Sequence, residues 1–179
     1  MPFDAVLFDR DGTLVVDVPY NGDPARVRPV PGAAAALTLL RDVGIPVGVV
    51  TNQAGIARGL LTGDAVRAVN ARVEELLGPF AVWQVCPHGP TDGCRCRKPE
   101  PGMVLAAAAA LGVPAGRVAV VGDIGADVAA AEAAGGVGVL VPTPATRAEE
   151  VRDARVVCRN LLDAVRHLLG EATADPRRA

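Results

Sequence analysis

Residues 5–14 read AVLFDRDGTL, four apolar residues followed by an acidic turn. A short, continuous apolar run such as Ala5–Phe8 is typical of a strand that is buried on both faces of a sheet. Similar Val-rich runs recur along the chain. The predicted strands are Ala5–Phe8, Pro46–Val50, Ala81–Val85, Val118–Val121 and Val137–Val141.

Ala-rich segments between these runs are predicted to be helices. Thr62 is a plausible N-cap, and glycines at positions 44, 78, 112 and 135 stand where helices end. The alternation of strands and helices predicts an α/β fold, a doubly wound, Rossmann-like parallel sheet that binds ligands beyond the carboxyl ends of its strands. We expect one domain over residues 1–170 and a disordered tail over 171–179. The predicted helices are Gly32–Val43, Thr62–Leu77, Gly102–Leu111, Ala126–Ala134 and Asn160–Leu169.

The composition excludes several classes of protein. Half of the 179 residues are hydrophobic and 21% are charged, which is unlike a disordered chain. The formal charge of −2 leaves no basic surplus for nucleic acid. No charge-free apolar stretch is long enough to span a membrane, and acidic residues interrupt the N-terminal segment where a secretory signal would be apolar. We therefore expect a cytoplasmic monomer that binds neither nucleic acid nor membranes.

Polar residues follow the predicted strands at the edge where ligands bind. The first strand is followed by Asp9 and Asp11, the second by Thr51, and the fourth by Asp123. The third leads to Lys98, the only lysine among 18 basic residues. Because the carboxyl ends of parallel strands share one edge, these side chains are expected to meet.

Together these residue types suit phosphoryl transfer. Asp9 and Asp123 would supply oxygen ligands to Mg²⁺, and a carboxylate can attack phosphorus to form an aspartyl phosphate. Lys98 would offset the repulsion between that carboxylate and the phosphate, while Thr51 would hydrogen-bond the transferring oxygens. Asp11 would protonate the leaving group and later deprotonate water.

The segment from Asp9 to Leu14 resembles the first motif of the haloacid-dehalogenase-type (HAD) phosphatases. Thr51, Lys98 and the segment Gly122–Asp127 match the second, third and fourth motifs in order. The resemblance implies an HAD-like fold, Asp9 as nucleophile and Asp11 as general acid/base. It also implies Mg²⁺ held by Asp9, Asp123 and the Asp11 carbonyl, with Asp127 supporting the metal site from behind.

Each motif alone has a plainer interpretation. A D-x-D pair is more often a solvated turn, Thr51 could be a helix cap, and Lys98 could be a surface residue. These interpretations require four coincidences at four successive strand ends, so the catalytic hypothesis is favoured.

A second cluster precedes Lys98. Cys86, His88, Cys94 and Cys96 lie within eleven residues and offer four ligands for a closed, structural Zn²⁺ site. Such a zinc would staple a Pro/Gly-rich loop that leads into Arg97 and Lys98. The alternative is a set of unliganded thiols in an irregular loop. Cys158 and His167 lie apart from the cluster, and no function is expected of them.

The zinc loop before Arg97 is similar to that of two HAD families, the heptose-bisphosphate and the histidinol-phosphate phosphatases, and residues 51–59 are nearly the heptose-enzyme string. The heptose resemblance implies that Arg97 holds a second phosphate. The implied substrate-lining residues are Asp9, Arg10, Asp11, Asp17, Tyr20, Thr51, Asn52, Gln53, Ala54, Arg97 and Lys98.

Three features depart from the heptose pattern. Val15 stands where Asn is frequent, and Ile124 stands where Lys is frequent. The five-residue gap between His88 and Cys94 is closer to the histidinol-phosphate type. These departures affect the substrate and leave the reaction class unchanged.

No segment is long enough for a separate lid. The residues between Gly12 and Gly32, and those between Asn52 and Ala81, are too few to form a cap domain. We therefore expect a capless enzyme with an open site, which suits a small phosphorylated sugar and argues against a mutase.

The resemblance implies a Mg²⁺-dependent phosphatase that acts on the C7 phosphate of D-glycero-D-manno-heptose 1,7-bisphosphate. The alternatives are a phosphatase of histidinol phosphate or another small phosphomonoester and, remotely, a phospho-accepting receiver module. A receiver would carry its phosphorylated Asp after the third strand, where this chain has Cys86.

Overall fold

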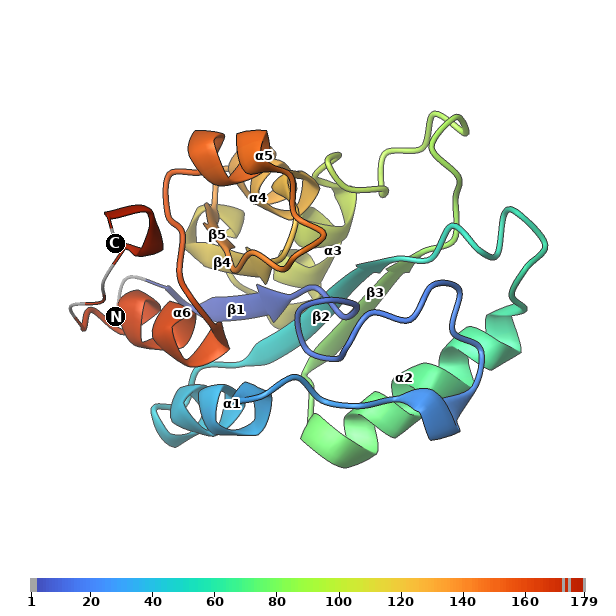
Figure 1. Ribbon diagram of the computed structural model, residues 1–179, viewed down its shortest axis with the longest axis horizontal. Helices are drawn as coiled ribbons and strands as arrows, with labels where there is room; N and C mark the ends of the chain where they lie inside the picture. The colour runs from blue at the N-terminus through green and yellow to red at the C-terminus, as the bar shows by residue number, and fades with distance from the viewer. Residues whose placement is uncertain (1–2, 172, 174, 179) are drawn as a thin grey trace.

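The computed structural model describes residues 3–171, 173 and 175–178. Their five parallel strands form one sheet in the order β3-β2-β1-β4-β5, with β1 in the centre (Figure 1). This topology confirms the predicted doubly wound α/β fold. The strands are β1 (Ala5–Phe8), β2 (Val47–Asn52), β3 (Val82–Cys86), β4 (Val118–Gly122) and β5 (Val137–Leu140).

Helices cover both faces of the sheet, as Figure 1 shows. One face packs against α1 (Ala33–Asp42), α2 (Gly63–Leu77) and α6 (Leu161–Leu168). The other packs against α3 (Gly102–Leu111) and α4 (Gly125–Ala133), while α5 (Ala148–Asp153) lies beyond β5. Short 3-10 turns are formed by η1 (Pro24–Arg26), η2 (Ala115–Arg117) and η3 (Pro176–Arg178).

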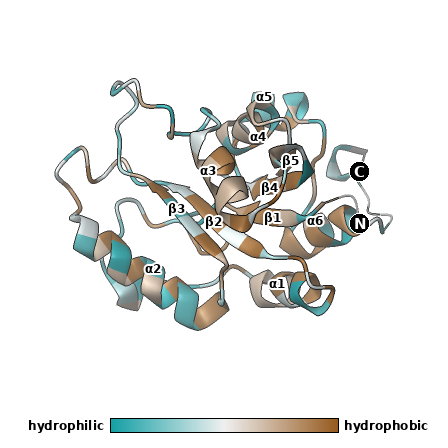
Figure 2. Cartoon of the chain, turned by 180° about the vertical axis from the view of Figure 1, so that it is seen from behind, coloured by the Kyte–Doolittle hydropathy of each residue, from teal (hydrophilic) through white to brown (hydrophobic). Residues whose placement is uncertain are grey.

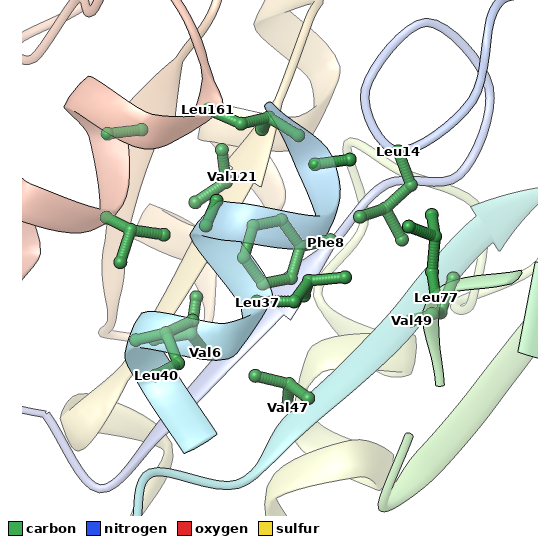
Figure 3. Packing of buried hydrophobic residues seen from close by; sticks show 14 of the residues in the cluster. Val6, Phe8, Leu14, Leu37, Leu40, Val47, Val49, Leu77, Val121 and Leu161 are labelled. Carbon is green, nitrogen blue, oxygen red and sulfur yellow. The ribbon is translucent and has the colours of Figure 1, made fainter. Parts of the chain in front are cut away.

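The central strand shows why its residues are apolar without interruption. Val6 and Phe8 belong to the core beneath α1, where Figure 3 shows Phe8 beside Leu37. Ala5 and Leu7 belong to the core on the opposite face. Burying a large apolar side chain contributes about 1.5–3 kcal/mol, so every position of this strand favours the two-sided arrangement. Figure 2 shows hydrophobic strands in the interior and hydrophilic residues along α2.

The helix ends follow local capping chemistry. The Thr62 hydroxyl accepts a hydrogen bond from the Ala65 amide at 3.1 Å, which confirms the predicted N-cap of α2. Gly112 ends α3 in the left-handed conformation (φ 68°), where a side chain would be strained. Gly78 also follows a helix, but its backbone is extended.

Several boundaries differ from the sequence prediction. β2 continues through Thr51 and Asn52, which pair with Val85 and Cys86 of β3, so these residues form the end of the strand instead of following it. β3 is an edge strand, and all of it except Cys86 is half-buried, contrary to the expectation of burial on both faces. The six-residue α5 was not predicted, because its short polar sequence carries no apolar periodicity.

The described part of the C-terminal tail contacts the rest of the molecule. Pro176–Arg178 form η3, and Arg177 donates a hydrogen bond to the Ala154 carbonyl at 2.8 Å. The contact joins these residues of the predicted tail to Ala154, which directly follows α5. Residues 172, 174 and 179 of the predicted tail lie outside the described residues.

The described chain contains no lid over the carboxyl ends of the strands. Only η1 lies between β1 and α1, and only α2 lies between β2 and β3. The capless architecture is therefore confirmed for these segments. Within the described residues, no helix has the length and apolar character needed to cross a membrane.

Candidate active site

The sheet brings the predicted catalytic residues to one edge. Asp9 follows β1, and its amide donates to the Val121 carbonyl of β4 at 2.9 Å, which extends the strand pairing by one residue. Asp123 directly follows β4, the neighbour of β1. Thr51, near the end of β2, is 1% exposed. Loops that follow β1, β2 and β3 extend from this edge (Figure 1).

Lys98 is buried at the centre of this edge. Its Nζ lies 2.7 Å from Asp9 Oδ1 and 2.5 Å from Asp127 Oδ1, and it donates to the Val50 carbonyl at 2.8 Å. Burial alone would lower the pKa of Lys98, but the carboxylates of Asp127 and Asp9 outweigh it and raise the pKa. Lys98 is therefore a fixed ammonium ion that touches the predicted nucleophile.

The main chain of Lys98 is held by Asn52. The Asn52 Oδ1 accepts from the Lys98 amide, and its Nδ2 donates to the Lys98 carbonyl, both at 3.1 Å. Both polar ends of the Asn52 amide are therefore used on the main chain of Lys98. Asn52 was predicted to line the substrate site, and in this structure its side chain holds the main chain of the predicted catalytic lysine.

Asp9, Asp123 and Asp127 form a compact group of buried carboxylates. One oxygen from each lies within 4.8 Å of the others. Burial raises the pKa of Asp9 to about 8, against the opposing attraction of Lys98. Burial, together with the charge of Asp127, raises the pKa of Asp123 to about 7. When ionised, the three carboxylates and one ammonium carry two uncompensated negative charges, which matches a divalent cation.

The backbone leaves room for this group only because residue 12 is glycine. A Cβ at Gly12 would lie 2.4 Å from Asp123 Oδ2, and its φ of +82° is one that other residues rarely adopt. Asp127 uses Oδ1 on Lys98 and accepts the Ile124 amide with Oδ2 at 3.2 Å. Asp9 and Asp123 are therefore the carboxylates best placed for direct metal binding, and Asp127 holds the lysine.

Asp11 lies beside this group within a hydrogen-bond network. Gln53 Nε2 donates to Asp11 Oδ2 at 2.8 Å and to Thr51 Oγ1 at 2.9 Å. Arg10 Nη2 donates to the same Oδ2 at 2.8 Å. The predicted general acid/base and the predicted phosphate-binding hydroxyl are thus joined through one amide.

Arg10 and Gln53 were predicted to line the substrate site, and the structure places both side chains beside Asp11. Their side chains are buried, and Arg10 is only 1% exposed. Each is turned toward Asp11, and Arg10 also reaches Asn70 on α2 at 2.6 Å. A guanidinium enclosed by protein needs internal acceptors, which Asp11 and Asn70 provide to Arg10.

The predicted substrate loop lies at the open side of the site. Asp17 is an exposed residue. The pKa of its carboxyl group is nevertheless raised, first by partial removal from water and then by the nearby negative charge of Asp11. Tyr20 is 45% exposed and is the one described non-glycine residue with positive φ. Its hydroxyl accepts a hydrogen bond from Arg58, whose guanidinium lies 5.7 Å from the ring centroid. Ala54 is half-buried, and its carbonyl accepts the Arg58 amide at 3.1 Å.

The cysteine–histidine cluster forms a compact group at the end of β3. The Sγ atoms of Cys86, Cys94 and Cys96 lie 3.2–3.8 Å apart, and His88 Nδ1 is 3.2 Å from Cys96 Sγ. A tetrahedral Zn²⁺ with Zn–S bonds of about 2.3 Å separates its sulfur ligands by about 3.8 Å. The four residues therefore fit a zinc ion. The Arg97 guanidinium donates to the His88 carbonyl at 3.2 Å, which ties Arg97 to this loop.

An open pocket of about 820 Å³ lies between α4 and α5, bordered by Pro99 and Ile124 beside the site. Its cations are paired with neighbouring acids, Arg147 with Glu149 and Glu150, and Arg152 with Asp153. Ile124 stands where the heptose pattern often has a lysine. Neither Arg147 nor Arg152 of this pocket is an unpaired cation that could take the place of that lysine.

The structure adds residues that were not among the predicted site residues. Thr146 donates to the Asp123 carbonyl at 2.6 Å, and Thr13 lies 3.5 Å from Asp123 Oδ1. Asn70 and Arg58 support Arg10 and Tyr20, as described above. Arg58 and Thr13 lie within stretches quoted from the sequence, whereas no local pattern marks Thr146 or Asn70. Cys158 is buried and His167 is exposed, away from both clusters.

Comparison with known proteins identifies relatives of this chain. Residues 95–165 match the HAD-hydrolase-like family. The D-glycero-β-D-manno-heptose-1,7-bisphosphate 7-phosphatase of Pseudomonas aeruginosa is 38% identical over 143 residues, 77% of this chain and 80% of the relative. The enzyme of the same name from Bordetella bronchiseptica is 34% identical over 176 residues, 93% of this chain and 98% of the relative.

A solved structure gives the same result. The crystal structure of D,D-heptose 1,7-bisphosphate phosphatase from B. bronchiseptica, complexed with magnesium and phosphate, matches with a TM-score of 0.85 and 33% identity. The match covers 95% of this chain and all of that one. Fold and site thus define an HAD-like hydrolase. Within that class, the chain belongs to the family of the heptose-1,7-bisphosphate 7-phosphatases. Membership of this family rules out the receiver-module alternative.

Proposed function

We propose that this protein is a Mg²⁺-dependent phosphatase that removes the C7 phosphate of D-glycero-β-D-manno-heptose 1,7-bisphosphate through an aspartyl-phosphate intermediate. The observation that carries the proposal is the buried group at the strand ends, where Asp9 touches the Lys98 ammonium at 2.7 Å beside Asp123. The names of the P. aeruginosa and B. bronchiseptica relatives support the substrate and the β anomer.

Asp9, Asp123 and the Asp11 carbonyl would hold the Mg²⁺. Bound there, the ion supplies positive charge that lowers the repulsion between a carboxylate nucleophile and a phosphate dianion. Asp127 and Thr146 support the site. Asp127 pairs with Lys98, and Thr146 donates a hydrogen bond to the Asp123 carbonyl.

The chain's own residues account for two successive displacements. In the first, an Asp9 oxygen attacks phosphorus, the bond from phosphorus to the C7 oxygen breaks, and Asp11 gives its proton to that oxygen. Lys98 and Thr51 bind the transferring phosphoryl oxygens. In the second, Asp11 takes a proton from water, the water oxygen attacks phosphorus, and Asp9 leaves as a free carboxylate.

Substrate recognition falls to the residues around the opening. Arg97 uses one N–H donor in its hydrogen bond to the His88 carbonyl. Because a guanidinium has five N–H donors in a planar fork, Arg97 can also bind the second phosphate. Asp17 and Tyr20 extend from the loop after β1 and would contact the sugar, with Ala54 lining the wall. A structural Zn²⁺ held by Cys86, His88, Cys94 and Cys96 would fix the loop that carries Arg97.

We also propose a cytoplasmic monomer with no nucleic-acid or membrane partner. Cys86, Cys94 and Cys96, which would bind a metal together, are unpaired thiols, and thiols stay reduced in the cytoplasm, which supports the cytoplasmic location.

The test is phosphate release with Mg²⁺ from a panel: both anomers of heptose 1,7-bisphosphate, fructose 1,6-bisphosphate, histidinol phosphate and 4-nitrophenyl phosphate. We expect kcat/KM for the β-heptose to exceed that for the others by at least about a hundredfold, or about 2.7 kcal/mol of transition-state stabilisation. A preference for histidinol phosphate would overturn the substrate. Absence of turnover on the whole panel, in metal-replete protein, would overturn the reaction. Asp9→Asn is the control, because it removes the nucleophile and is expected to abolish release.

A further inference from the structure

Asp11 is reached from α2 through a buried arginine. Asn70 lies in the middle of this helix, and its Oδ1 accepts a hydrogen bond from Arg10 Nη1 at 2.6 Å. The opposite side of the same guanidinium donates hydrogen bonds to Asp11, from Nη2 to Oδ2 at 2.8 Å and from Nε to Oδ1 at 3.1 Å. The planar fork of Arg10 thus spans two acceptors on opposite sides, and with 1% exposure it has little room to move.

The two oxygens of Asp11 are held unequally. Oδ2 accepts from Arg10 Nη2 and from Gln53 Nε2, both at 2.8 Å. Oδ1 accepts only the longer contact from Arg10 Nε among the described residues. Because Oδ2 is engaged by two strong donors, Oδ1 is the oxygen with capacity for a proton. The Asp11 side chain is 25% exposed, so a reacting group can reach it.

We propose that Asn70 is a positioning residue for the general acid/base, acting on Asp11 through Arg10. Asn70 fixes the guanidinium, the guanidinium and Gln53 fix Oδ2, and Oδ1 is thereby aimed at the leaving oxygen. Asn70 lies outside every motif of the site. This inference rests on the proposed phosphatase function, with Asp11 as the group that protonates the leaving group.

The choice of leaving group provides a measurement that would not change if Asn70 had only a structural role. A sugar alkoxide is a poor leaving group that needs Asp11 Oδ1 to protonate it, whereas 4-nitrophenolate departs without a proton. The ratio of kcat/KM for heptose 1,7-bisphosphate to that for 4-nitrophenyl phosphate therefore reports proton delivery. Since kcat/KM covers only steps through departure of the leaving group, later hydrolysis of the phosphoenzyme does not affect it.

The experiment compares the wild type with Asn70→Ala, Arg10→Lys and Asp11→Asn, with Mg²⁺ present. General acid catalysis contributes about 10²–10⁴-fold. We expect Asp11→Asn to lower the ratio by about 10²-fold or more, and Asn70→Ala by about tenfold. Arg10→Lys should fall between them, because one ammonium cannot span Asp11 and Asn70. Asn70→Asp keeps an acceptor oxygen for Arg10 and should restore the ratio to within about threefold of the wild type.

Arg72→Ala is the matched control, because this residue of the same helix has a 43% exposed side chain that pairs with Glu75, and its loss should leave the ratio unchanged. An Asn70→Ala ratio equal to that of the wild type would overturn the proposal, whether both rates fall together or neither changes. Failure of the wild type to hydrolyse either substrate would instead overturn the phosphatase function. Circular dichroism and thermal melting of each variant show that it is folded. Asn70→Ala is expected to disturb the fold less than Arg10→Lys, because Asn70 is only half-buried whereas Arg10 is buried.

Discussion

At the scale of single residues, the site consists of charges that are buried together. Lys98 contacts two carboxylates, and these contacts offset the cost of removing all three groups from water. The same arrangement makes each partner depend on the others. The residues proposed to perform the chemistry are therefore also residues on which stability depends.

Replacing Lys98 with Met is expected to destabilise the metal-free protein by about 3–5 kcal/mol, because Asp9 and Asp127 lose their buried counter-ion. Urea denaturation of the wild type and the variant measures the change in free energy of unfolding. Arg72→Met removes an exposed ion pair with Glu75 and should cost less than about 1 kcal/mol. Equal losses in the two variants would contradict the importance of the buried cluster.

The raised pKa values of Asp9 and Asp123 predict how pH affects the metal-free protein. Between the ordinary Asp value of 3.8 and about 7–8, the folded state binds more protons than the unfolded state. Stability therefore falls as pH rises through this window. We expect Tm without Mg²⁺ to be lower at about pH 8 than at about pH 5, and added Mg²⁺ to raise Tm more at the higher pH.

Asp123→Asn provides the control for this pH dependence. The variant removes one of the two titrating groups and one carboxylate ligand. Its Tm should depend less on pH and respond less to Mg²⁺. A variant with the same response to Mg²⁺ as the wild type would exclude Asp123 as a ligand.

At the scale of elements, the loop between β3 and α3 carries two side chains with different supports. Arg97 is bonded to the His88 carbonyl within the cysteine–histidine loop. The main chain of Lys98 is instead held by Asn52 at the end of β2. The position of Arg97 therefore depends more on the cysteine–histidine loop than the position of Lys98 does.

Loss of zinc is accordingly expected to affect binding more than chemistry. Cys94→Ser should lower zinc content, measured by atomic absorption, and raise KM for the bisphosphate by about tenfold, since the charge-assisted hydrogen bonds of Arg97 are worth about 1.5–3 kcal/mol each. The KM for 4-nitrophenyl phosphate, which has no second phosphate, should change less than about twofold. Cys158→Ala, outside the cluster, should retain the zinc content of the wild type. Equal effects on both substrates would mean that the loop also positions Lys98.

At the scale of the whole molecule, the described part of the fold leaves the site open, and the proposed monomer can be tested against its surface. The exposed large hydrophobic residues are spread over separate elements, among them Val43 after α1, Leu105 on α3 and Val137 on β5. Scattered apolar residues are normal for a monomer. Light scattering after gel filtration is expected to give the monomer mass of 18.3 kDa, and a mass of twice that value would contradict the prediction.

Hydrophobic patterning along the chain was enough to predict the five strands, five of the helices and the meeting of Asp9, Thr51, Lys98 and Asp123. The physical reason is that strand burial is a local pattern and parallel strands bring their carboxyl ends to one edge. The tertiary structure alone showed that Arg10 and Gln53 face Asp11, that Asn52 holds Lys98, and that Asn70 and Thr146 support the site. These contacts join residues far apart in the chain, such as Arg10 and Asn70 at a separation of 60 positions. They depend on how α2 and the loops pack against the sheet, which no local pattern records.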